Sequence, residues 1–203
     1  MATRCRDECI RKATSSSRSQ PKLLLVSSDR SWEHDVNSLF SKLKFSNDRL
    51  PNADLSVKSP VTGALQQQLD GEAYLQFGLL GELQQVLLSS NELVAPFSGR
   101  CVRRDETASL LSFVHPQGLR LDVLFPNAYQ QHGQGFFWHV PVDSQVQSGQ
   151  PVLTIDGSRL QQWQAPVSCL LQLHDHPKFQ TIHGRTGFIS AADDLLYSIE
   201  LKK

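Results

Sequence analysis

The chain has 203 residues, and 20 Lys or Arg residues balance 20 Asp or Glu residues, so its formal net charge at pH 7 is zero. This balance excludes a protein that relies on an excess of Lys and Arg to hold nucleic acid. No stretch approaches the roughly 18 apolar residues of a membrane-spanning helix, and the early apolar run at residues 23–26 is too short for the core of a secretory signal. We therefore expect a cytoplasmic protein with one folded domain and an extension.

The first 35 residues lack the pattern of a folded element. A run of hydroxyl residues spans 14–17, and basic residues predominate around it. Basic, Ser-rich tails are usually solvated and disordered. We therefore predict that residues 1–35 are a disordered or non-native extension, the latter if the natural product starts near Val36.

Residues 36–46 are predicted to form a short amphipathic helix, followed by a linker at residues 47–54. The apolar residues at i, i+3, i+4 and i+7 lie on one helical stripe and are Val36, Leu39, Phe40 and Leu43. Because short basic amphipathic helices can bind a membrane surface, residues 36–45 are a candidate for peripheral contact with the inner membrane through Leu39, Phe40 and Leu43. Docking of the same helix on the domain is the alternative.

From Leu55 onward the pattern changes to short alternating or β-branched runs that are broken by Gly, Pro and Asn. Such runs predict strands, here over residues 93–95, 110–114, 119–125, 151–155 and 195–201. No long amphipathic helix pattern occurs, so residues 55–203 are predicted to be an all-β domain. Cys101 and Cys169 lie in its apolar strands and are expected to be reduced and buried.

A pentapeptide repeats within this domain. Ser-Pro-Val-Thr-Gly at 59–63 recurs as Ala-Pro-Phe-Ser-Gly at 95–99. Proline interrupts ladder hydrogen bonding and glycine permits a positive φ, so both copies are expected to form the same corner between a loop and a strand. A V-x-x-G-x-x-V segment at 146–152 further predicts a hairpin. Repeated corners with short strands suit a barrel or sandwich of two similar halves.

Residues 55–203 resemble the glucose-type enzyme IIA domain of the bacterial phosphoenolpyruvate-dependent sugar phosphotransferase system. That family carries an A-P-x-[TS]-G corner twice, as at 59–63 and 95–99 here, and then a glycine-led strand and a G-x-G-F turn, as at 118–128 and 133–136. Its optional N-terminal segment L-F-x-K-L-K matches residues 39–44. The resemblance implies an all-β duplicated hybrid motif, a barrel or sandwich with a short N-terminal amphipathic helix, and no cofactor or metal.

The resemblance also implies a phosphate-accepting histidine, which this chain lacks. Aligned on the glycine that opens the strand, the nucleophile position falls on Leu124, and its partner histidine falls on Ser109. Leucine has no lone pair with which to attack a phosphoryl group. The family's acidic residue falls on Ala128 or, with a one-residue slip, on Asn127, so the charge near the site is lost too. His132 is the histidine nearest in sequence to the lost site and is the fallback acceptor.

These features favour an enzyme IIA-like protein that has lost its chemistry and serves as a regulatory or docking module. The resemblance implies that the family's active face is also its docking face, which here comprises Ser109, Leu124, Phe125 and Asn127. Its partners are expected to be phosphotransferase components, transporters or metabolic enzymes. The alternative is an active phosphocarrier in sugar uptake that uses a non-aligned histidine, so enzymatic activity stays open.

A zinc peptidase of similar hybrid architecture is a remote alternative. That family is marked by an H-x-x-x-D pair and an H-x-H strand, and this chain has His139 with Asp143 and His174 with His176. The first pair lies late in the domain, where Asp143 is expected to be a turn residue. A zinc site would need these side chains to converge.

Overall fold

The computed structural model describes residues 42–46, 51, 53–66, 83–104, 110–126, 135–141, 143–158 and 167–203. Every described residue belongs to one compact unit, Ser31–Lys203. Strands dominate that unit and confirm the prediction of an all-β domain. No helix in the described part of the chain is long and apolar enough to cross a membrane.

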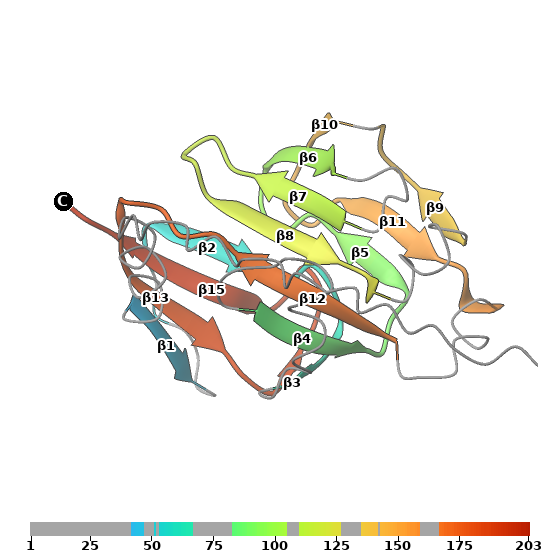
Figure 1. Ribbon diagram of the computed structural model, residues 1–203, viewed down its shortest axis with the longest axis horizontal. Helices are drawn as coiled ribbons and strands as arrows, with labels where there is room; N and C mark the ends of the chain where they lie inside the picture. The colour runs from blue at the N-terminus through green and yellow to red at the C-terminus, as the bar shows by residue number, and fades with distance from the viewer. Residues whose placement is uncertain are drawn as a thin grey trace, which may run out of the picture. The chain divides into compact units, whose positions relative to one another are not determined.

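The strands form three sheets (Figure 1). Their bounds are β1 (Leu43–Ser46), β2 (Leu55–Lys58), β3 (Gly63–Gln66), β4 (Leu83–Leu88), β5 (Glu92–Val94), β6 (Gly99–Arg103), β7 (Leu110–Val114), β8 (Arg120–Leu124), β9 (Phe136–Trp138), β10 (Ser144–Val146), β11 (Pro151–Ile155), β12 (Ser168–Leu173), β13 (Phe179–Arg185), β14 (Phe188–Ile189) and β15 (Leu195–Leu201). The sheet orders are β1-β13-β15-β2, β10-β6-β7-β8-β12-β4-β3-β14 and β5-β11-β9. The five strands predicted from the sequence correspond to β5, β7, β8, β11 and β15.

The last four residues of the predicted N-terminal helix, 43–46, form strand β1 instead. β1 pairs in parallel with β13, with Leu43 opposite Ile182, so the edge of β13 satisfies backbone groups of this segment. Leu43 packs against the core, which corrects its prediction as a membrane-facing residue. Leu39 and Phe40 lie outside the described residues, and the helix before β1 stays a prediction.

The described part of the predicted linker lies outside the strands and is fastened to β15. The Ser198 hydroxyl donates to the carbonyl of Pro51. The Leu201 N–H donates to a carboxylate oxygen of Asp54 at 2.8 Å. The chain that enters the β domain is therefore held against the strand that ends it.

The repeated pentapeptide forms two corners that hydrogen-bond to each other reciprocally. The Lys58 N–H donates to the Pro96 carbonyl at 3.0 Å, and the Val94 N–H donates to the Pro60 carbonyl at 2.9 Å. Each donor lies two residues before the proline of its own copy. A pseudo-twofold duplication predicts such a reciprocal pair of hydrogen bonds. The pair confirms that the two copies form equivalent corners.

The hydroxyl of each copy also has an equivalent partner. Thr62 Oγ1 accepts the Ala191 N–H at 2.9 Å, and Ser98 Oγ accepts the Ser148 N–H at 3.1 Å. The turns that supply these donors each contain a residue with positive φ. The duplication therefore extends from the corners to the two turns that cap them.

The corner glycines are required for close approach rather than for a positive φ. Gly63 and Gly99 are not among the residues with positive φ. A Cβ on Gly63 would lie 2.1 Å from the carbonyl oxygen of Leu87, and one on Gly99 would lie 2.3 Å from that of Val114. The conformational reason given for these glycines above is therefore wrong, and the operative reason is that a neighbouring strand occupies the space of a side chain.

This close approach predicts a large effect of a small change. Replacing Gly99 with alanine is expected to lower the free energy of unfolding by about 3 kcal/mol, because backbone atoms on both sides must move. Urea unfolding measures the loss. Gly157→Ala is the matched control, since a Cβ there meets nothing within 4 Å and its effect should stay within about 0.5 kcal/mol. Equal stability of the two variants would contradict the packing described for the corner.

The segment at 146–152 forms a turn but not the predicted hairpin. The Gln150 N–H donates to the Gln147 carbonyl at 3.0 Å. However, β10 pairs with β6, whereas β11 pairs with β5 and β9 in a different sheet. The turn is docked on the second corner, so the strands on either side of it diverge.

The core is apolar and holds both described cysteines. Cys101 and Cys169 are buried and free, as the sequence predicted. Burial, with the negative charge of Asp143 adding to it, raises the pKa of the Cys101 thiol to about 11. Burial also raises the pKa of Cys169. Neither thiol is disposed to ionise at neutral pH.

Candidate functional site

Strand β8 carries the aligned nucleophile position and lies between β7 and β12 (Figure 1). Side chains alternate across a strand, and Leu121 and Val123 belong to the core cluster. Arg120, Asp122 and Leu124 therefore point to the opposite face of the sheet. This face is the candidate functional site.

The position aligned with the family nucleophile is enclosed in a row of leucines. Leu124 is paired in register with Leu110 on β7 and with Leu170 on β12. Leu124 is only 3% exposed, and Leu170 is buried as well. No lone pair and little solvent access exist at the position that the resemblance predicts for the nucleophile.

The predicted docking face is corrected by the burial of its described members. Phe125 is 1% exposed and belongs to the core, where its ring meets Phe136 edge-on at 5.5 Å. Leu124 is likewise closed to a partner. Ser109, Asn127 and the fallback acceptor His132 lie outside the described residues, so their roles stay predictions.

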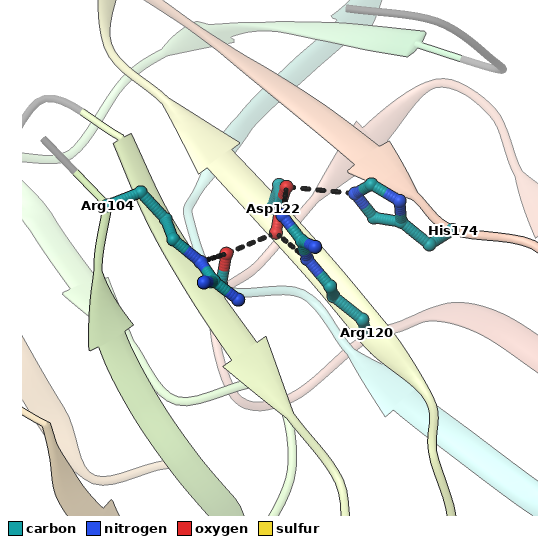
Figure 2. Close-up of polar contacts among 5 residues, drawn as sticks. Arg104, Arg120, Asp122 and His174 are labelled. Atoms are coloured by element: carbon teal, nitrogen blue, oxygen red, sulfur yellow. Dashed lines mark hydrogen bonds and ion pairs between the residues drawn. The ribbon is translucent and has the colours of Figure 1, made fainter.

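Two residues before Leu124 on β8, a carboxylate occupies the middle of the same face. Asp122 is paired with Ser112 on β7 and with Gln172 on β12, and all three are buried. Figure 2 shows Asp122 with side chains converging on it. The Arg120 guanidinium donates twice, from Nε to Oδ1 at 2.8 Å and from Nη2 to Oδ2 at 2.6 Å. Ser112 Oγ donates to Oδ1 at 2.6 Å, and His174 Nε2 lies 2.8 Å from Oδ2.

These contacts keep Asp122 ionised. Burial alone would raise the pKa of this carboxyl group, but hydrogen bonds from His174, Arg120 and Ser112, together with the charge of His174, lower the pKa to about 2. An ionised carboxylate only accepts hydrogen bonds. The proton between Asp122 and His174 is therefore carried by Nε2 of the imidazole.

Because the proton is fixed on Nε2, Nδ1 is the ring nitrogen of His174 whose hydrogen-bonding role can change. In the neutral imidazole Nδ1 has a lone pair and can act as a base or nucleophile, and in the protonated form it is a donor. The side chain of His174 is 34% exposed, so a ligand can approach it. A buried carboxylate that orients a partly exposed imidazole is an arrangement suited to proton transfer or nucleophilic attack.

A second arginine extends the network. Arg104, at the end of β6, donates from Nε to Ser112 Oγ at 2.8 Å. Arg104 is exposed, and the side chain of Arg120 is 35% exposed. The exposed rim of this face is thus made of Arg104, Arg120 and His174, and its floor is the buried Asp122 (Figure 2).

The sequence reasoning missed this network. The sequence predicts for His174 only a role as a zinc ligand in the peptidase alternative, and it predicts none for Asp122. The available signal is the charged residue at the centre of Arg-Leu-Asp-Val-Leu, within the largely apolar strand predicted at 119–125. A charge in such a position requires partners on adjacent strands.

The histidines of the zinc alternative do not converge. His139 Nε2 lies 2.6 Å from Thr154 Oγ1, and His174 is held by Asp122. Asp143 is a turn residue with a φ of 58°. Within the described ranges, no group of three His, Cys, Asp or Glu side chains is placed to hold a metal ion. The geometry gives the zinc alternative no support.

No protein-family model matches the chain, and no curated protein matches it in sequence. Among solved structures, it is similar to glucose permease IIA from Mycoplasma capricolum, with a TM-score of 0.59 and 18% sequence identity. The alignment covers 70% of this chain and 94% of that one. This chain therefore has a glucose-type enzyme IIA-like fold. At this identity the likeness extends to the enzyme IIA-like fold alone, and the residues of the site decide which chemistry it supports.

Proposed function

We propose that this chain is an enzyme IIA-like protein of the sugar phosphotransferase system that has lost the phosphate-accepting histidine and acts in the cytoplasm as a regulatory or docking module. The observation that carries the proposal is the leucine row Leu110–Leu124–Leu170 at the aligned nucleophile position. A phosphocarrier needs an accessible nitrogen there, and the row offers apolar side chains instead, of which Leu124 and Leu170 are buried.

The docking contact is assigned to the exposed rim rather than to the leucines. Arg104, Arg120 and His174 are the accessible members of the network, and arginine is enriched at interface hot spots. Partners of this module are phosphotransferase components, transporters or metabolic enzymes.

A second candidate function is a phosphocarrier that uses His174. What favours it is the contact of His174 Nε2 with Asp122, which leaves Nδ1 available. In that reaction Nδ1 attacks the phosphorus of a phosphohistidine on a carrier protein, a new N–P bond forms, and the donor's N–P bond breaks with return of its electron pair to the donor imidazole. His132 is retained as a further acceptor to be tested.

One experiment separates these functions. The purified chain is incubated with phosphoenolpyruvate and the two general phosphotransferase proteins, and its intact mass is measured at neutral pH. The docking module predicts no gain of phosphate beside an active enzyme IIA that gains one. A gain that is lost in acid would overturn the proposal, and its abolition by His174→Gln or by His132→Ala would identify the acceptor.

Docking itself is tested by titrating the ¹⁵N-labelled chain with the unlabelled histidine-containing carrier protein. Chemical-shift changes confined to β8, β12 and the rim residues are expected. An unchanged spectrum with every phosphotransferase component would contradict a docking role within this system.

A further inference from the structure

The rim of the site carries positive charge that the network does not neutralise. Two guanidinium groups are connected to one carboxylate, so the described arginine and aspartate side chains of the network carry a net charge of +1. The acidic residue next to His174 does not change this balance, because both carboxylate oxygens of Asp175 accept the Lys42 ammonium, at 2.8 and 2.9 Å. The described side chains of this face therefore leave an excess of positive charge.

The two guanidinium groups are close enough to act on one ligand. Three consecutive hydrogen bonds, of 2.8, 2.6 and 2.8 Å, connect Arg104 Nε to Arg120 Nε through Ser112 and Asp122. A phosphate group with a hydrogen bond on each side can bridge a span of this size. Among the described residues, the network uses Nε of Arg104 and Nε and Nη2 of Arg120, and the remaining Nη atoms of the two guanidinium groups have no partner.

Asp122 orders the side chains of Arg120 and His174 before a ligand binds. Its two oxygens fix Arg120 through a bidentate contact and orient His174. Side chains that are already ordered lose less conformational entropy when a ligand binds. The buried carboxylate thus positions the groups on the rim without itself contacting the ligand.

The donor set indicates the chemical class of the ligand. A single arginine fork is sufficient for the two oxygens of a carboxylate. Two separate guanidinium groups and an imidazole suit an anion with three terminal oxygens and a double charge. We propose that Arg104, Arg120 and His174 bind a phosphoryl dianion, carried either by the docking partner or by a small phosphorylated molecule. The first source rests on the proposed docking function, and the second does not.

The test uses the full ¹⁵N-labelled chain and inorganic phosphate, with chloride at equal ionic strength as the reference. The Nε–H signals of Arg104 and Arg120 are expected to shift in a saturable way. Arg104→Gln should weaken binding about tenfold, because one charge-assisted contact is lost. Arg104 is the informative position because it is exposed and its loss leaves the Arg120–Asp122 pair intact.

Arg103→Gln is the matched control. It removes the same charge one residue away, but the Arg103 guanidinium lies 5.1 Å from the centre of the Trp138 ring and outside the network. Its phosphate affinity should stay within about twofold of the parent, because that arginine makes no contact with the site. Equal weakening by the two variants, or shifts that do not saturate, would overturn the proposed site.

The source of the phosphoryl group is decided by comparing the phosphorylated and unphosphorylated carrier protein. Binding of the phosphorylated form about tenfold more tightly, lost in Arg104→Gln, would identify a protein-borne group. Binding of inorganic phosphate or phenyl phosphate without binding of the carrier would support the anion site while contradicting the docking function. Carrier binding with no phosphate effect would overturn the anion site and leave the docking function standing.

Discussion

Replacing Asp122 with asparagine is expected to lower the free energy of unfolding by about 3 kcal/mol, measured by urea denaturation. The substitution preserves shape but removes the charge that Arg120 and His174 both contact. The introduced amide NH2 would face hydrogen-bond donors, and the Arg120 charge would lose its partner. Buried networks lose more when one member is removed than an exposed ion pair does, because the remaining groups stay desolvated.

Asp175→Asn is the control for this loss. Asp175 pairs with Lys42 at the surface, so its removal is expected to cost about 0.5 kcal/mol. If both substitutions lowered the free energy of unfolding equally, the buried network around Asp122 could not be the stabilising element.

Acid titration gives an independent check on Asp122. Its pKa is lowered from 3.8 to about 2 in the folded chain, so the ionised form stabilises the fold above pH 3.8 and this stabilisation is lost as the pH falls through 2. The shift corresponds to about 2 kcal/mol. The difference in the free energy of unfolding between the parent and Asp122→Asn should therefore decrease as the pH falls from 3.8 to about 2. Above pH 3.8 this difference should stay constant.

The fold was predictable because its signals are local and repeated. Short apolar runs between turn residues identified β7, β8, β11 and β15, and the repeated pentapeptide identified the duplication. The sequence predicts less well which strands pair with one another. Residues 146–152 contain turn chemistry that favours a hairpin, but the bonds that direct β10 and β11 into separate sheets come from a corner about fifty residues earlier in the sequence.

Residues 43–46 also show that local sequence does not specify which strand a segment pairs with. Their sequence continues a helical stripe, yet an available edge on β13 and the absence of a side chain on Gly184 favour a strand. A Cβ on Gly184 would lie 2.7 Å from the ring of Phe45, so that ring could not occupy its present place. A partner 139 residues later in the printed sequence, as in the pair Phe45–Gly184, overrides a local helical preference.

The site was predictable in part. The resemblance predicts Leu124 at the nucleophile position, and this assignment stays a prediction. Alternation along β8 places Leu124 on the same face of the sheet as Asp122. Its burial and the Asp122 network depend on the register of three strands, which a single sequence does not specify. Phe125 was assigned to the docking face because it adjoins Leu124, although adjacent residues on a strand point to opposite faces.

Introducing histidine at position 124 provides the strongest test of the leucine row. Leu124→His is expected to lower the free energy of unfolding by about 3 kcal/mol, since an imidazole replaces a well-packed side chain and has only leucines beside it in register. We also expect no phosphate on the introduced imidazole in the assay with phosphoenolpyruvate and the general phosphotransferase proteins. Residue 124 is 3% exposed, and in-line attack requires a nitrogen that the donor can reach.

Leu124→Met is the control, because it conserves volume and should cost less than about 1.5 kcal/mol. Circular dichroism of all three chains ensures that any absence of phosphate is not a consequence of unfolding. An acid-labile phosphate on Leu124→His would mean that the position is open to a carrier protein and that one side chain separates this chain from an active phosphocarrier. Its absence from a folded variant would mean that the whole row, Leu110 and Leu170 included, closes the position, so that the accessible chemistry of this face belongs to Arg104, Arg120 and His174.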